Sequence, residues 1–173
     1  PDEGGKSRAV YLANVLGLDM GMFYKRRDYT QIVDGRNPIV AHEFLGSSVE
    51  GKDVIIIDDM ISSGDSIIDV ATELKRRKAK RIFAAATFGL FTNGLDKFDK
   101  AYEEGIIHGI LTTNLIYQTP ELLSRPYYIN CDLSKYIALL IDTLNHDGSI
   151  SSILSPNERI QHVVQKYKNG EPI

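Results

Sequence analysis

Apolar and polar residues along this chain follow two periods, which predict helices and strands in alternation. Apolar residues recur at helical spacing from Ser7 to Leu16, and Gly17 then suits a C-terminal cap. Residues 54–57 read Val-Ile-Ile-Ile, an uninterrupted β-branched run typical of a strand buried on both faces. By the same criteria we expect strands at 20–24, 39–45, 54–57, 81–88, 107–112 and 127–131, and helices at 7–16, from Ser66 to about 77, and at 93–104, 133–144 and 156–168.

This order of elements predicts the fold class. Strands that alternate with helices form a mainly parallel sheet with helices on both faces, so we expect a three-layer α/β domain. In such folds the ligand site lies beyond the carboxyl ends of the strands. That rule directs attention to the end of the 54–57 strand. The polar run 28–38 has no helical period and is expected to be a loop.

Composition excludes several classes of function. The chain has 173 residues, the length of one domain, and its 43% apolar content can form a core. A net charge of -3 argues against a nucleic-acid binder, and the single Cys131 excludes a disulfide framework or multi-thiolate zinc site. No apolar run reaches the ~18 residues that span a bilayer. We therefore expect a soluble, cytoplasmic domain without membrane or nucleic-acid partners, and its start at Pro1 suggests a piece of a longer protein.

The segment from Val54 to Ser66 carries the clearest chemical signal. A buried strand delivers two carboxylates, Asp58 and Asp59, to its own carboxyl end. A short loop rich in serine then leads into a helix, whose N-terminal amides and hydroxyls form an anion site suited to a phosphate monoester. The adjacent acids can accept hydrogen bonds from vicinal sugar hydroxyls. Phosphate at one end and a diol at the other together describe ribose 5-phosphate.

A simpler interpretation of this loop is a serine N-cap before an acidic helix start. The loop alone does not decide between the two interpretations, but the aspartate pair carried by the strand favours sugar-phosphate binding. We expect this site to consist of Asp58, Asp59, Ser62, Ser63, Gly64, Asp65 and Ser66.

This segment resembles the phosphoribosyl-pyrophosphate motif of type I phosphoribosyltransferases and of their relatives, the ribose-phosphate pyrophosphokinases. Two other segments favour the second group. Residues 1–9 are similar to its Pro-Asp-x-Gly-Gly diphosphate loop, and Lys25-Arg26-Arg27 is similar to its mobile catalytic loop. Weaker similarities continue to about residue 154. The resemblance implies a phosphoribosyltransferase-like fold for 1–154, the C-terminal half of a subunit whose N-terminal half is absent here, followed by a tail helix at 155–173.

The resemblance also implies a reaction. The family transfers the diphosphoryl group of ATP to the C1 hydroxyl of ribose 5-phosphate, with Mg2+ as cofactor, giving phosphoribosyl pyrophosphate and AMP. Lys25 and Arg27 would be catalytic and neutralise charge on the transferred group. Asp2, Gly4 and Gly5 would bind the diphosphate, and Asp2 would also be a magnesium ligand. Taken alone, residues 25–27 would be a solvated basic patch.

Some positions depart from the family pattern Asp-Asp-x-x-Asp-Thr-x-Gly-Thr. Ser62 replaces the third acid, and Asp65 stands where a glycine is usual, which places a negative charge beside a phosphate site. That charge is tolerable if the Asp65 side chain turns outward and weakens binding if it turns inward. Tyr24 replaces an acid before the lysine, Phe88 replaces a common histidine, and the loop after residue 27 is longer than expected.

Two further functions stay open on the sequence. One is a type I phosphoribosyltransferase, and the other is a non-catalytic regulatory subunit associated with a synthase, which Ser62 and Asp65 favour. The resemblance implies a homo-oligomer, from dimer to hexamer, for the full-length protein. We also expect the isolated chain to bind ribose 5-phosphate weakly and to make no phosphoribosyl pyrophosphate, because the family's other half supplies most of the adenine pocket.

Overall fold

We describe the protein from a computed structural model, which covers residues 3–27 and 39–172. The side chains of residues 3–5, 24–27, 39–43 and 152 lie outside this description. The elements along the chain are α1 Glu3–Leu16, β1 Met22–Arg27, β2 Ile39–Leu45, β3 Asp53–Ile61, α2 Asp65–Arg76, β4 Arg81–Gly89, α3 Asp96–Glu103, β5 Gly109–Thr113, α4 Pro120–Leu123, β6 Tyr128–Cys131, α5 Ser134–Asn145, α6 Ser151–Leu154 and α7 Asn157–Asn169.

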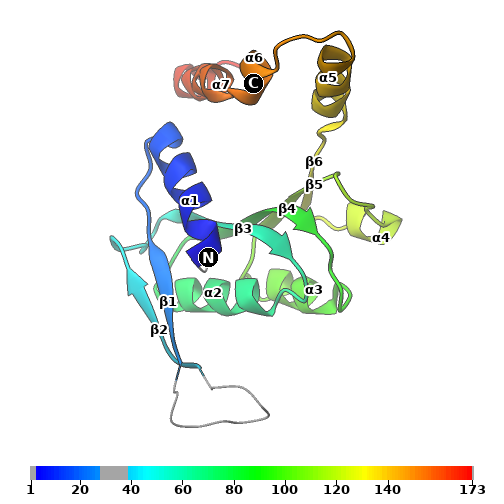
Figure 1. Ribbon diagram of the computed structural model, residues 1–173. Helices are drawn as coiled ribbons and strands as arrows, with labels where there is room; N and C mark the ends of the chain where they lie inside the picture. The colour runs from blue at the N-terminus through cyan, green and yellow to red at the C-terminus, as the bar shows by residue number, and fades with distance from the viewer. Residues whose placement is uncertain (1–2, 28–38, 173) are drawn as a thin grey trace.

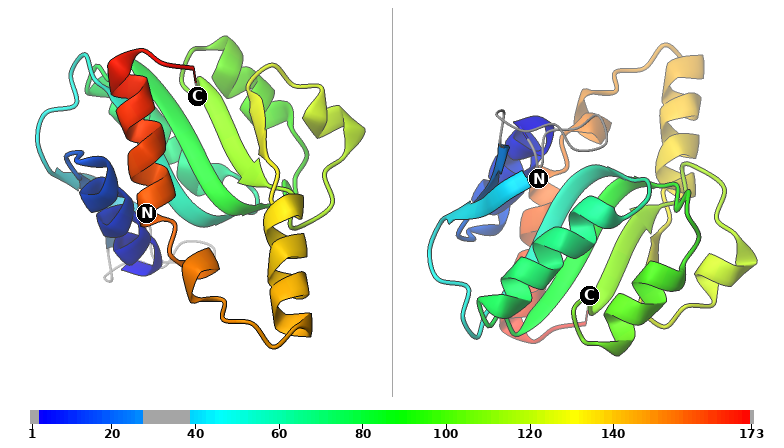
Figure 2. Two further views of the ribbon diagram at one scale, coloured as in Figure 1. Left: turned by 90° about the horizontal axis from the view of Figure 1, so that it is seen from above. Right: turned by 90° about the horizontal axis from the view of Figure 1, so that it is seen from below.

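A four-stranded parallel sheet in the order β3-β4-β5-β6 forms the centre of the molecule. Helices α2 and α3 cover one face, while α1 and α7 lie on the opposite side (Figures 1 and 2). The predicted α/β class with a mainly parallel sheet is therefore confirmed. β1 and β2 form a separate antiparallel hairpin, which projects beside α2 (Figure 1).

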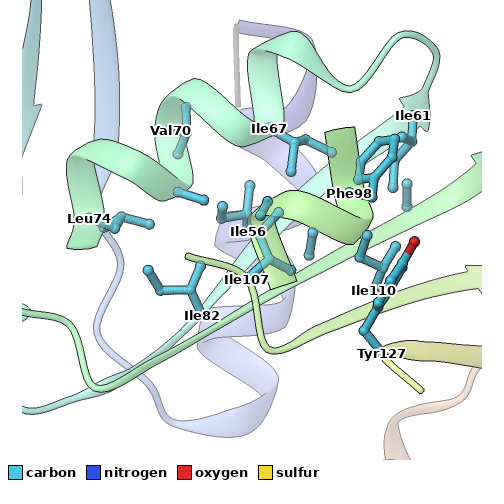
Figure 3. Packing of buried hydrophobic residues seen from close by; sticks show 14 of the residues in the cluster. Ile56, Ile61, Ile67, Val70, Leu74, Ile82, Phe98, Ile107, Ile110 and Tyr127 are labelled. Carbon is cyan, nitrogen blue, oxygen red and sulfur yellow. The ribbon is translucent and has the colours of Figure 1, made fainter. Parts of the chain in front are cut away.

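The hydrophobic core lies between the sheet and the α2–α3 layer. Alternate residues of adjacent strands point to this side, as the twofold period of a strand requires. They meet the apolar faces of the two helices, and Figure 3 shows the packing. Its members include Ile56, Ile61, Ile67, Val70, Leu74, Ile82, Phe98, Ile107, Ile110 and Tyr127.

The opposite face of the sheet is less well covered. We predicted that residues 54–57 would be buried on both faces, and this was wrong: Ile56 is 5% exposed, but its neighbour Ile55 is 46% exposed. The reason is that β3 is an edge strand of the parallel sheet, with β4 on only one side. Beside it lies an apolar cavity of about 430 Å³, lined by residues of α1, β1 and β3.

Helix α1 runs antiparallel to β3. Near its start, Arg8 lies 3.6 Å from the Asp59 carboxylate towards the end of β3. Just after its end, Asp19 accepts a hydrogen bond of 3.2 Å from Lys52, which precedes β3. The tail helix α7 packs beside α1, where the Tyr11 hydroxyl donates to the Asn157 side chain (2.6 Å). These polar contacts hold α1 at both ends, while its apolar side lines the cavity.

The structure changes some predicted elements. α1 begins at Glu3, four residues before the predicted start, so the two glycines expected in a loop lie in its first turn. β1 extends through Lys25 and Arg27 because it pairs with β2, whereas we expected these residues in a loop. Helices α4 and α6 were not predicted, and each has four residues. The predicted loop at 28–38 lies outside the described residues.

Two neighbouring isoleucines test the uneven cover of β3. We expect Ile56→Ala to lower the free energy of unfolding by about 2–4 kcal/mol, because it removes fully buried methyl groups and leaves a void. Ile55→Ala deletes the same atoms from a side chain that is half-exposed. It should lower the free energy of unfolding by less than about half of the loss in Ile56→Ala. Urea unfolding followed by circular dichroism measures both; equal losses would contradict the one-sided core.

Candidate functional site

The two predicted aspartates lie within β3, close to its carboxyl end. The strand continues past them to Ile61, so they belong to the last part of the strand rather than to the loop that follows. The Asp58 side chain is half-buried, and its Oδ1 accepts a hydrogen bond of 2.8 Å from the backbone N–H of Asp59. The Asp59 side chain is exposed and faces Arg8 from α1. Asp59 thus lies beside the N-terminal half of α1.

The environments of Asp58 and Asp59 shift their pKa values in opposite directions. Burial raises the pKa of Asp58, and the negative charge of Asp59 adds to this effect. The pKa of Asp59 is lowered, mainly by a hydrogen bond with Asp58 and further by the Arg8 guanidinium. The pair therefore presents one readily ionised carboxylate and one that holds its proton more tightly. Such a pair can accept and share hydrogen bonds with two vicinal hydroxyls.

The loop after β3 ends in Gly64, which caps α2 in a left-handed conformation (φ 83°). Gly64 has no side chain with which to cap the helix, so the first-turn amides receive no cap from this position. A helix start of this kind is suited to an anion, because its amide dipoles point outward. Ser62 and Ser63 precede the glycine, and Asp65 and Ser66 begin the helix. The predicted loop residues thus share one helix N-terminus.

Contact with α3 fixes the position of this loop. A Cβ atom at Gly64 would come 2.1 Å from Cζ of Phe98, a residue that is 1% exposed. The ring of Phe98 also meets Phe91 edge-on, with centroids 5.1 Å apart. The turn after β4 contributes as well, since the backbone N–H of Thr92 donates to the Ser62 carbonyl (3.1 Å). The loop after β3 is therefore held in place by α3 and by the turn that follows β4.

The Asp65 side chain is held by partners in α3 and in the loop. Its carboxylate accepts hydrogen bonds from Lys97 of α3 and from the Ser63 hydroxyl (2.9 Å). Lys97 is the main reason that the pKa of Asp65 is lowered, and Ser63 adds to it. Asp65 is thus a charged carboxylate at neutral pH, held by partners on both of its oxygens.

The structure describes less of the other predicted site residues. Asp2 lies outside the described residues. Gly4 and Gly5 belong to the first turn of α1, the half of the helix that approaches Asp59. Lys25 and Arg27 lie on β1, opposite His42 and Ile39 of β2, and only their backbones are described. The structure therefore places residues 58–66 together at the end of β3 and the start of α2, and it describes only the backbones of Lys25 and Arg27.

Three residues near the site had no role in the sequence analysis. They are Arg8, Thr92 and Lys97, which contact Asp59, Ser62 and Asp65. Thr92 lies in the turn after β4, three residues beyond its end at Gly89, so the rule that ligands bind at strand carboxyl ends could have identified it. Nothing local marks Arg8 or Lys97, because their partners lie far away in the sequence.

The described residues contain no cluster of three or more histidine, cysteine, aspartate or glutamate side chains suited to a metal ion. Within the same residues, no helix has the length and apolar character needed to cross a membrane.

Comparison with known proteins identifies the family. The profile of the phosphoribosyl transferase domain matches residues 1–109. Among curated proteins, the chain is 31% identical to ribose-phosphate pyrophosphokinase of Vibrio parahaemolyticus over 157 residues, covering 90% of this chain and 46% of that protein. It is 35% identical to ribose-phosphate pyrophosphokinase of Thermococcus kodakarensis over 126 residues, covering 71% and 42%.

A solved structure shares the fold. The crystal structure of phosphoribosylpyrophosphate synthetase from Mycobacterium smegmatis superposes with a TM-score of 0.65 at 20% identity, covering 83% of this chain and 42% of that one. The chain spans about half the length of the curated relatives that it matches.

The close approach of Gly64 to Phe98 gives a stability prediction. We expect Gly64→Ala to lower the free energy of unfolding by about 3 kcal/mol or more, because it adds a steric overlap to the strain of a positive φ. Gly94→Ala is the matched control: Gly94 also has a positive φ (77°), but no atom would lie within 4 Å of the added Cβ. Gly94→Ala should lower the free energy of unfolding by about 1 kcal/mol. Thermal unfolding compares the two, and similar losses would contradict the packing argument.

Proposed function

We infer the function of this chain from its family: it belongs to the phosphoribosyl transferase domain family, and its matched relatives are ribose-phosphate pyrophosphokinases. We propose that it is the ribose 5-phosphate-binding half of such an enzyme. The enzyme would transfer the diphosphoryl group of ATP to the C1 hydroxyl of ribose 5-phosphate. The observation that supports this best is the pairing of two carboxylates at the end of β3 with the glycine-led helix start that follows them.

In this proposal the two ends of the substrate bind to different chemistry. The 5'-phosphate accepts hydrogen bonds from the backbone amides and hydroxyls of residues 62–66 at the start of α2. Asp58 and Asp59 accept hydrogen bonds from the two ring hydroxyls, and Arg8 keeps Asp59 ionised and oriented. Phosphoryl transfer needs positioning and charge stabilisation more than covalent help, so a rigid sugar site is a direct contribution to catalysis.

The remaining roles rest on the family resemblance. Lys25 and Arg27 would neutralise charge on the transferred group, and Gly4 and Gly5 would leave room beside the diphosphate. Mg2+ is commonly bound by one or two carboxylates together with substrate phosphates. A single carboxylate such as Asp2 fits that donor set. When bound, the ion would neutralise charge on the phosphate oxygens.

We propose that residues 1–154 are the C-terminal domain of a longer, cytoplasmic subunit and that 155–173 are its tail. Two observations support this division. The chain spans about half of its relatives, and the apolar run of β3 forms an open sheet edge beside an apolar cavity of about 430 Å³. Since α1 runs antiparallel to β3, a strand entering α1 from upstream would run parallel to β3 through this cavity. Oligomer formation belongs to that longer protein.

Two other functions remain candidates. A type I phosphoribosyltransferase would use the same sugar-phosphate site, and a regulatory subunit would keep the fold without turnover. The positions of Ser62 and Asp65 favour the regulatory subunit, because the family pattern has an acid and a glycine there. An assay of the longer natural protein separates all three. The proposed enzyme releases AMP from ATP only with ribose 5-phosphate, a transferase releases pyrophosphate from phosphoribosyl pyrophosphate given a base, and a regulatory subunit does neither.

The 173-residue chain itself gives a second test. We expect it to bind ribose 5-phosphate weakly, with chemical-shift changes at the amides of residues 63–66, and to release no AMP from ATP. The reason is that the sugar site lies within the chain, whereas its relatives are about twice as long. AMP release by the purified chain would disprove the assignment of an incomplete site, and the absence of binding at millimolar ribose 5-phosphate would disprove the sugar site.

Asp58→Asn separates a binding role from a structural one. We expect this variant to lose at least tenfold in affinity for ribose 5-phosphate while its free energy of unfolding at pH 7 does not fall. The pKa of Asp58 is raised in the folded protein, so folding favours its protonated form. Its contribution to stability therefore decreases as the pH rises through that pKa, and a neutral amide avoids this loss. Lower stability together with unchanged affinity would assign Asp58 to the fold instead.

A further inference from the structure

Asp65 creates an electrostatic problem at the proposed phosphate site. It is the first residue of α2, next to the amides that would bind the phosphate. Lys97 and Ser63 keep the pKa of its carboxyl below the usual value, so protonation does not remove the charge at neutral pH. A fixed negative charge beside a phosphate dianion opposes binding, whereas a helix N-terminus favours it. Some group must offset this charge if the loop is to bind an anion well.

The fold holds Lys97 where its positive charge can offset the negative charge of Asp65. It directly precedes Phe98, whose ring packs beneath Gly64, so the first turn of α3 is fixed against the loop. The same helix is tied down further along: Asp99 accepts hydrogen bonds from the Tyr127 hydroxyl (2.6 Å) and from Nε of Arg125 (2.9 Å). The backbone that carries Lys97 is therefore anchored from two sides. The ammonium group itself remains at the surface, in contact with Asp65.

We propose that Lys97 is a positioning residue of the phosphate site, which offsets the charge of Asp65 and holds this carboxylate against α3, away from the bound phosphate. The inference rests on the proposed sugar-phosphate function. Lys97 engages Oδ1 of Asp65 while the Ser63 hydroxyl engages Oδ2, so both oxygens are occupied within the loop. Lys97 thus acts through Asp65, and the phosphate is bound by the amides.

A double-mutant cycle tests this role, with affinities for inorganic phosphate and ribose 5-phosphate measured by NMR titration. We expect Lys97→Met to weaken binding of both probes roughly tenfold, because the Asp65 carboxylate is then no longer held against α3. One unit charge about 6 Å from a dianion in a water-like medium has an effect of this size. In the Asp65→Asn background the same change should cost less than about threefold, since no carboxylate is left to hold away and only the screened attraction between the exposed Lys97 and the phosphate is lost. Lys97→Arg, which keeps the charge, should retain affinity within about threefold.

Lys100→Met is the matched control, because Lys100 lies on the same helix and contacts Glu104 rather than the loop. We expect it to leave both affinities within about twofold. Folding of each variant is checked by its thermal midpoint. A second readout is the pKa of Asp65, which should rise in Lys97→Met, as followed by carboxyl NMR.

The outcomes are distinct. Equal losses for Lys97→Met in both backgrounds would overturn the inference and make Lys97 a direct phosphate ligand. An unchanged affinity in Lys97→Met, with binding intact in the wild type, would overturn it as well. Absence of binding in the wild type and in Asp65→Asn would instead disprove the proposed sugar-phosphate site.

Discussion

The position of the loop after β3 depends on the packing of Phe98 beneath Gly64. This contact requires a residue with no Cβ at the start of α2, and the left-handed conformation of Gly64 requires the same residue for an independent reason. Phe98 in turn meets Phe91, which meets Tyr128 edge-on, with centroids 6.3 Å apart. A line of aromatic contacts therefore runs from the loop to β6. The backbone of the proposed anion site is held by the core rather than by the loop itself.

The eight-residue stretch from Asp58 to Asp65 contains three carboxylates, and each has a different environment. Asp58 is partly buried, which raises its pKa; Asp59 is exposed and lies near Arg8; Asp65 contacts Lys97 and Ser63. Both cations come from other helices, α1 on one side of the loop and α3 on the other. The balance of charge at the site is thus a property of tertiary structure, and removing either helix contact would leave an acidic cluster next to an anion site.

The sequence predicted where residues 58–66 lie in the fold because the signal that places them is local. A β-branched run, two aspartates and a glycine-containing turn follow one another, and the strand-end rule places them at the site edge without further information. What could not be predicted is non-local. Lys97 and Asp65 are 32 residues apart, and β1 extends through Lys25 only because β2 pairs with it. Ile55 was expected to be buried, since periodicity reports side-chain character and cannot tell a central strand from an edge strand.

The uneven core divides the proposed site into two halves that differ in rigidity. The sugar-phosphate loop lies against the α2–α3 layer, where Phe98 and Ile61 are almost fully buried. The segment assigned to the diphosphate starts α1, whose apolar side lines a cavity and whose ends are held by exposed ion pairs and by α7. Exposed ion pairs contribute little to stability, so the position of α1 depends mainly on its contacts with β3 and α7. The loop proposed to bind the phosphate is therefore held by the buried core, whereas the helix assigned to the diphosphate borders a cavity of about 430 Å³. This difference gives a physical reason for the proposal that the chain binds the sugar phosphate without completing the transfer.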